Sequence, residues 1–254
     1  MAPAGRGGML LPNSWNGRSW SCMVSCGIAS PSLNPSSPDP VNRPFYFALC
    51  LFGRGPLWFC SRKEVRGGHF LDTAGGCLLA ANHRSPYDCM MMMGSTWRVI
   101  RWVSAVEVSL GPWRRFFRWI GVIPLDRSKR DPKAVRRMIS LMQSGEVVGL
   151  FPEGTLRTGS DAVTSGGSLN ENLCRLAQLA QVPVVPCAVA GGEQFSHWTA
   201  WLPLRRTRWA VHYGAPLPPG PDLSQRLREA LITLYAVAAN PQSRRARLDS
   251  RQKS

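Results

Sequence analysis

The sequence predicts an α/β fold, with a mixed, largely parallel central sheet flanked by helices. The first reason is that short apolar runs alternate with helical patterns between residues 67 and 211, an order typical of α/β proteins. The second is that 254 residues, of which 44% are hydrophobic and 18% charged, suffice for one sizeable core. The expected strands cover residues 77–81, 99–103, 122–125, 147–151, 182–189 and 209–213.

The clearest helix is expected after Asp131, which suits an N-cap, and Pro132, which suits the first helical position. Apolar residues then recur at i, i+3, i+4 and i+7 until Gly145 ends the pattern. Similar spacing predicts further helices over residues 169–181 and 223–238.

Composition divides the chain into four segments. Residues 1–40 are rich in Gly, Ser, Pro and Asn, which predicts a poorly ordered extension. Residues 41–66 are aromatic and apolar and are expected to contact a membrane, and residues 67–238 hold the α/β domain. Residues 239–254 are polar and basic and predict a tail. No secretory signal is expected, because prolines and asparagines interrupt the apolar start of the chain.

The second segment contains an apolar run from Phe45 to Phe59 that residues 53–56 (Gly-Arg-Gly-Pro) interrupt. The interruption predicts two pieces, each too short to span a bilayer. Such a run either lies on a membrane surface or forms a core helix and a strand, and its irregular periodicity favours neither. We therefore expect no transmembrane helix and leave both alternatives open.

The charge of the chain indicates an anionic partner. Thirty-one Lys and Arg residues stand against fifteen Asp and Glu residues, which gives a formal net charge of +16. A field of this sign attracts nucleic acid, anionic lipid, phosphorylated substrates and acidic carrier proteins alike, so the motifs must decide among them.

Residues 112–120 predict a basic amphipathic helix, which starts at Pro112 and ends before Gly121. It either lies in the interface of an anionic bilayer or covers the core with its aromatic face, and both alternatives stay open. The apolar face holds Trp113, Phe116, Phe117 and Ile120, and the basic face holds Arg114, Arg115 and Arg118.

The first motif with chemical content is Asn82-His83-Arg84-Ser85-Pro86-Tyr87-Asp88, directly after a predicted buried strand. Ser85 is expected to cap the next helix, with Asp88 at its third position. From there the carboxylate of Asp88 can reach back to the ring of His83 and fix one tautomer. A histidine held in this way is a candidate general base, and a loop histidine beside a capping aspartate is the alternative.

Two further motifs follow predicted strands. Gly121-Val-Ile-Pro-Leu-Asp-Arg127 places a guanidinium at a strand end, where it can bind a phosphate with two parallel hydrogen bonds. Phe151-Pro-Glu-Gly-Thr155 runs into a loop whose amides, with Arg157, can bind an anion. Either motif alone is typical of a surface ion pair or turn, but ligands of open α/β sheets collect at the carboxyl ends of strands.

In this order, these motifs and the apolar Val182–Pro186 run resemble the glycerolipid acyltransferases of the 1-acylglycerol-3-phosphate acyltransferase (lysophosphatidate acyltransferase) type. The resemblance covers about residues 67–216 and includes that family's Asn-His-x4-Asp and Phe-Pro-Glu-Gly-Thr blocks. It implies transfer of an acyl chain from a thioester, carried by coenzyme A or by an acyl-carrier protein, to the hydroxyl of a lysophospholipid.

The resemblance also assigns roles to residues. It implies that His83 is the catalytic base, that Asp88 orients it, and that Arg127 binds the glycerol phosphate of the acceptor. Family members usually place Arg directly after Glu-Gly-Thr, whereas this chain has Leu156 there and Arg157 next. The remaining residues implied around the phosphate are Glu153, Gly154, Thr155 and Arg157.

We therefore expect an O-acyltransferase acting on 1-acylglycerol-3-phosphate at the cytoplasmic face of a membrane, as a peripheral or monotopic protein. No metal or cofactor is expected besides the thioester co-substrate, and the eight cysteines include no CxxC pair and indicate a reducing compartment. An acyltransferase with another lysolipid acceptor is one alternative. A basic nucleic-acid-binding protein is another, but it leaves the motifs unexplained. A serine hydrolase is disfavoured because Gly-x-Ser-x-Gly is absent.

Overall fold

The computed structural model describes residues 41–109, 112–129, 131–156, 159–202 and 207–240. The predicted N-terminal extension and all but the first two residues of the predicted tail lie outside these ranges.

A seven-stranded sheet forms the centre of the molecule, in the order β1-β7-β6-β2-β5-β3-β4. Neighbouring strands are parallel except β6 and β7, which pair antiparallel. The predicted mixed, largely parallel sheet is thereby confirmed. The strands are β1 (Ser61–Arg66), β2 (Cys77–Ala81), β3 (Ile100–Ala105), β4 (Ile123–Leu125), β5 (Val147–Leu150), β6 (Val184–Ala190) and β7 (Thr207–Tyr213).

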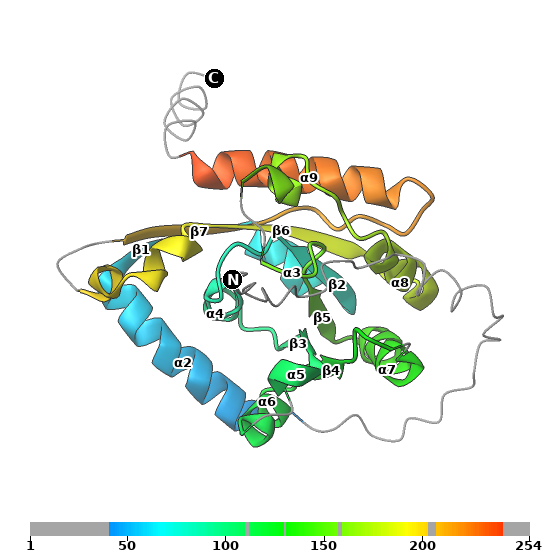
Figure 1. The fold of residues 1–254 in the computed structure, drawn as a ribbon, viewed down its shortest axis with the longest axis horizontal. Helices are drawn as coiled ribbons and strands as arrows, with labels where there is room; N and C mark the ends of the chain where they lie inside the picture. The colour runs from blue at the N-terminus through cyan, green and yellow to red at the C-terminus, as the bar shows by residue number, and fades with distance from the viewer. Residues whose placement is uncertain (1–40, 110–111, 130, 157–158, 203–206, 241–254) are drawn as a thin grey trace, which may run out of the picture.

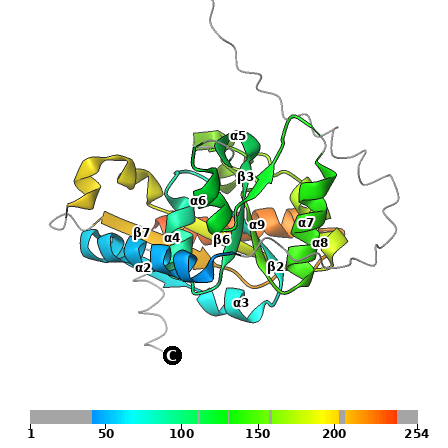
Figure 2. The same ribbon diagram turned by 90° about the horizontal axis from the view of Figure 1, so that it is seen from below.

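Helices cover both faces of the sheet (Figure 1, Figure 2), so the strands bury side chains on two sides. One face packs against α2 (Arg43–Cys60), α3 (Gly68–Thr73) and α4 (Asp88–Ser95), and the other against α7 (Pro132–Gln143), α8 (Asn172–Ala180) and α9 (Leu223–Ala239). The shorter helices are α5 (Val106–Ser109), α6 (Arg114–Trp119), η1 (Gly159–Asp161), η2 (Val163–Ser165), η3 (Gly192–Ser196) and η4 (Trp198–Trp201).

The cap of α7 is as predicted, because Asp131 accepts a hydrogen bond of 3.0 Å from the amide of Ala134. The helix ends at Gln143, two residues before Gly145, whose φ of +90° is the left-handed conformation that favours glycine. The predicted α8 begins three residues late, at Asn172, and α9 matches its prediction to within one residue.

The segment from Phe45 to Phe59 is one continuous helix, so the predicted break at residues 53–56 is wrong. Pro56 removes a hydrogen bond inside α2, but the helix packs against α4, β1 and η4, and this packing outweighs the local preference. Tyr46, Cys50 and Leu57 are buried on its inner side. Among the described residues, no helix combines the length and the apolar character that crossing a membrane requires.

The outer side of α2 is apolar and exposed. Leu51 is 64% exposed, Phe52 79% and Phe59 66%, and their spacing places them on one side of the helix. In contrast, the aromatic residues of α6 divide between the core and solvent. Phe116 and Phe117 pack against the core, which supports the core-facing alternative for them. The exposed aromatic side chains around α6 are those of Trp113 and Trp119.

Candidate active site

The predicted motifs meet at one edge of the sheet. Strands β2, β4, β5 and β6 all point the same way, so their carboxyl ends lie together. We call residues 82–88, which follow β2, the His83 turn. The side chain of Asn82 fixes the start of this turn to β6, because its amide nitrogen donates to the carbonyl of Val189 (3.0 Å) and its oxygen accepts from the Val189 amide (2.7 Å).

Asp88 holds the His83 turn together. Its Oδ2 atom accepts hydrogen bonds from the backbone amides of Arg84 and Ser85, both at 2.8 Å, and lies 3.3 Å from Nδ1 of His83. The side chain is 1% exposed. These bonds keep residues 84–87 in a turn, and the regular helix α4 begins at Asp88. The predicted capping by Ser85 is present, because its Oγ atom accepts a hydrogen bond of 3.2 Å from the amide of Tyr87. The same hydroxyl donates to the carbonyl of Gly192 at 3.0 Å.

The imidazole of His83 lies against a stack of aromatic rings. It stacks on Phe151 with 3.9 Å between ring centroids and 12° between planes, and Phe151 stacks on Trp102 at 5.0 Å and 8°. Gly149 makes room for this stack, because a Cβ atom there would lie 2.7 Å from the Trp102 ring. The His83 side chain remains 19% exposed. The ring is therefore held on one face and at Nδ1 while part of it reaches solvent.

Glu153, in the loop that follows β5, contacts the same turn. Its carboxylate accepts hydrogen bonds from the backbone amides of His83 and Val163, each at 2.9 Å. Burial raises the pKa of this carboxyl, and the two amide bonds oppose that rise. The carboxylate thus points at protein amides on the His83 side, and its contact with an acceptor phosphate stays a prediction.

Arg127 joins the other two motifs. It is exposed after β4, and its Nη1 donates to the carbonyl of Gly154 at 2.6 Å. A guanidinium has five N–H donors, so this bond leaves the group able to bind an anion as well. Thr155 and Leu156 are exposed beside it, whereas Arg157 lies outside the described residues.

Several contacts of the site had no signal in the sequence analysis. The ring stack joins residues 49 positions apart, and no periodicity predicts such a meeting. Arg84 donates to Glu193 at 2.6 Å, and its guanidinium lies 5.2 Å from the ring centroid of Tyr235 on α9. In the part of the chain that the structure describes, no group of three or more His, Cys, Asp or Glu side chains is placed to hold a metal ion.

A buried carboxylate in contact with a partly exposed histidine at the carboxyl edge of an α/β sheet is an arrangement that suits proton transfer. Residues 62–190, just over half of the chain, match the model of the family described as Acyltransferase, and the chain belongs to this family. The resemblance predicted from the motifs is thereby confirmed.

The chain is also similar to one curated protein and to one solved structure. A 1-acyl-sn-glycerol-3-phosphate acyltransferase of Bacillus subtilis (strain 168) is 29% identical over 123 residues, which are 48% of this chain and 59% of that protein. The chain thus spans about three fifths of this curated relative. The crystal structure of the 1-acyl-sn-glycerophosphate (LPA) acyltransferase PlsC from Thermotoga maritima has the same fold, with a TM-score of 0.60 and 21% identity over 75% of this chain and 78% of that one.

Proposed function

We propose that this protein transfers an acyl chain from an acyl thioester to the free hydroxyl of a lysophospholipid, and that the acceptor is 1-acylglycerol-3-phosphate, which yields phosphatidic acid. The observation that carries the proposal is the contact between Nδ1 of His83 and the buried carboxylate of Asp88 at the edge where the family's motifs meet. The Bacillus relative, named for this reaction, supports the choice of acceptor.

The reaction needs one base and no covalent bond between the acyl chain and the enzyme. In the tautomer with a proton on Nδ1, His83 donates to Asp88, and Nε2 is free to accept the proton of the acceptor hydroxyl. The hydroxyl oxygen then attacks the thioester carbonyl, and the tetrahedral intermediate expels the thiolate. The imidazolium returns the proton to the thiolate, so the base is restored. Asp88 stabilises the imidazolium in between.

Arg127 is the proposed ligand of the acceptor phosphate. Its bond to Gly154 places the guanidinium next to the Phe151–Thr155 motif. The phosphate can therefore bind to the guanidinium and to the exposed hydroxyl of Thr155 together. Arg157 remains a candidate for the same role. Because Glu153 already accepts two amides, we propose that it acts on the acceptor through the position of His83.

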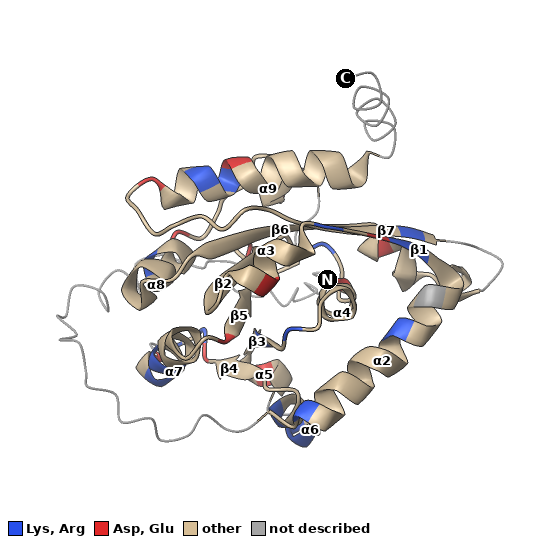
Figure 3. Ribbon diagram, turned by 180° about the vertical axis from the view of Figure 1, so that it is seen from behind, with Lys and Arg blue, Asp and Glu red and all other residues tan. Residues whose placement is uncertain are grey.

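The proposed place of action is the cytoplasmic face of a membrane, where the acceptor lipid resides, with peripheral or monotopic attachment. The exposed apolar side of α2 supports this location. Three large apolar side chains are grouped on one side of this helix, an arrangement that suits the interface of a bilayer. Lys and Arg residues at the nearby α6 add attraction to anionic lipid (Figure 3).

The test uses the purified full chain with a labelled acyl thioester, offered as acyl-CoA and as acyl-carrier protein, and a panel of lysolipids. We expect labelled phosphatidic acid when lysophosphatidate is the acceptor. Preferential labelling of another lysolipid would overturn the acceptor assignment and keep the reaction. Failure to label any lipid, combined with salt-dependent binding of nucleic acid, would overturn the reaction itself.

A further inference from the structure

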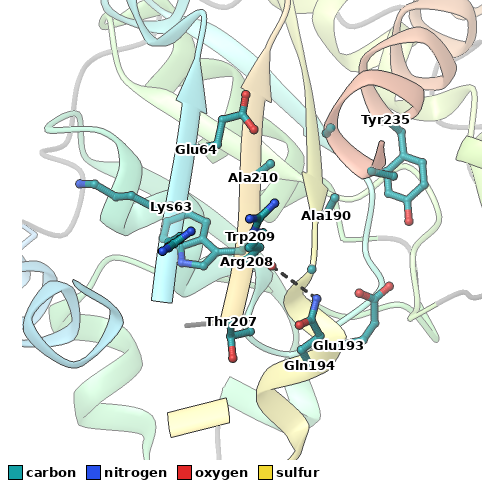
Figure 4. Close-up of a pocket in the computed structure, with 14 residues that line it drawn as sticks. Lys63, Glu64, Ala190, Glu193, Gln194, Thr207, Arg208, Trp209, Ala210 and Tyr235 are labelled. Carbon is teal, nitrogen blue, oxygen red and sulfur yellow. Dashed lines mark hydrogen bonds between the residues drawn. The ribbon is translucent and has the colours of Figure 1, made fainter. Parts of the chain in front are cut away.

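One cavity is lined by none of the residues proposed above for catalysis or for the acceptor phosphate. It is a groove of about 730 Å³ on the α9 face of the sheet, at the end formed by β1, β7 and β6 (Figure 4). Figure 4 shows Tyr235 of α9 on one side of the groove, with small Ala190 and Ala210 between it and β1. The volume is in the range of sites that bind small molecules and cofactors.

Two exposed arginines contribute positive charge to the groove, together with Lys63 of the same lining. Arg62 of β1 and Arg208 of β7 are register partners in a parallel pair, so their side chains project on the same side. Both are exposed, and neither forms an ion pair with a carboxylate among the described residues. The carboxylates of the lining are already engaged, because Glu64 pairs with Arg66 at 2.7 Å and Glu193 pairs with Arg84 at 2.6 Å.

The groove lies next to the His83 turn. Gly191, which lines the groove, and Gly192 follow the end of β6 and form the wall between the groove and the turn. A Cβ atom at Gly191 would lie 2.3 Å from the backbone oxygen of Arg208, and a Cβ atom at Gly192 would lie 2.5 Å from Oδ1 of Asp88. Two glycines therefore separate a groove arginine from the carboxylate that orients the base.

We propose that this groove binds the nucleotide phosphates of an acyl-CoA donor, with Arg62 and Arg208 as their ligands. The inference rests on the proposed acyl transfer. Coenzyme A carries its phosphates at one end and its thioester at the end of a flexible arm, so phosphates in the groove allow the thioester to reach His83 around the Gly191-Gly192 wall. A concave groove of this volume encloses a nucleotide, whereas a carrier protein docks on an open surface.

The test measures binding of free CoA to the full chain by calorimetry. The variant Arg62→Gln/Arg208→Gln should raise the dissociation constant of CoA about 10- to 100-fold, because it removes two charge-assisted contacts. Lys133→Gln/Arg136→Gln is the matched control, since it removes two positive charges from exposed positions on α7 and should leave binding unchanged. Arg62→Lys/Arg208→Lys should restore part of the affinity. In steady-state assays, the groove variant should raise the KM for acyl-CoA and leave the KM for the lysolipid unchanged.

Three results would overturn the assignment. One is unchanged CoA affinity in the groove variant. Another is a rise in the KM for the lysolipid instead of acyl-CoA, which would give the groove to the acceptor. The third is activity with acyl-carrier protein in a chain that does not bind CoA. Calorimetry needs no turnover, so CoA binding that depends on the two arginines would support the groove assignment even if no lysolipid were acylated. The absence of acylation would then overturn the proposed function alone.

Discussion

The His83 turn and the loop around Arg127 lie at the same edge of the sheet but are held in different ways. At the His83 turn, the buried carboxylates of Asp88 and Glu153 accept three backbone amides of the turn, Glu153 also accepts the amide of Val163, and an aromatic ring stacks on the imidazole. Arg127 is exposed, and one bond to a carbonyl positions it. The difference matches two tasks, because proton transfer needs geometry fixed before the substrate arrives, whereas an exposed cation can adjust to a mobile phosphate.

The largest effect should follow removal of the proposed base. His83→Ala should lower kcat about 10²- to 10⁴-fold, the range for loss of a general base, while the fold survives because the backbone amide of residue 83 still binds Glu153. Acyl-transfer assays, with circular dichroism as the folding control, would measure this. Transfer at the wild-type rate would refute the mechanism.

Asp88→Asn should come next, with kcat lowered about 100-fold or more, because an amide can present its NH₂ to Nδ1 and select the wrong tautomer. The double variant His83→Ala/Asp88→Asn should be no slower than His83→Ala alone, since the two side chains act as a unit. If the two losses multiplied instead, Asp88 would act mainly by holding residues 84–87 in their turn.

Arg127→Ala tests the other side of the comparison. It should raise the KM for lysophosphatidate about 10-fold, which corresponds to roughly 1.4 kcal/mol, and leave the KM for the thioester unchanged. The exposed Lys129→Ala, two residues along the same loop, is the control. Equal weakening for both substrates would show that Arg127 supports the loop and does not bind the phosphate.

The same comparison explains what the sequence predicted and what it did not. Local signals sufficed for strands β2 to β7, for the cap at Asp131 and for the residues at the strand ends, because each depends on a few neighbours in the chain. The edge strand β1 was missed because its sequence Ser-Arg-Lys-Glu-Val-Arg is polar and partly exposed. The break predicted in α2 was wrong because tertiary packing outweighed a proline.

The long-range contacts of the site could not be predicted from the sequence for a different reason. The ring stack depends on Gly149, whose missing side chain admits Trp102 behind Phe151, and no spacing rule encodes that space. Likewise, the family resemblance implied Glu153 near the acceptor phosphate, and no local pattern indicated that its carboxylate accepts two amides that only the folded chain brings to it.

Phe151→Leu should sharpen this view with a smaller effect. Leucine keeps the apolar contact but loses the flat face against the imidazole, so kcat should fall a few-fold to about 10-fold with little change in either KM. Phe151→Tyr, which preserves the ring, should restore most of the rate. A loss of stability without a loss of kcat in Phe151→Leu would assign the stack to the core alone.

The smallest effect is expected in the pH dependence of stability at Glu153. Burial raises the pKa of this carboxyl in the folded state, so the folded protein binds its proton more tightly than the unfolded chain does. Its contribution to stability is therefore fully present below the ordinary glutamate pKa and is lost as the pH rises through the raised folded value. Denaturant unfolding of the wild type and of Glu153→Gln should be measured from below the ordinary glutamate pKa to above the raised folded value. As the pH rises through this range, the unfolding free energy of the wild type should fall relative to that of Glu153→Gln. Above the raised value, the difference between the two should stay constant. A change in favour of the wild type would mean that the amides of His83 and Val163 outweigh burial and lower the pKa.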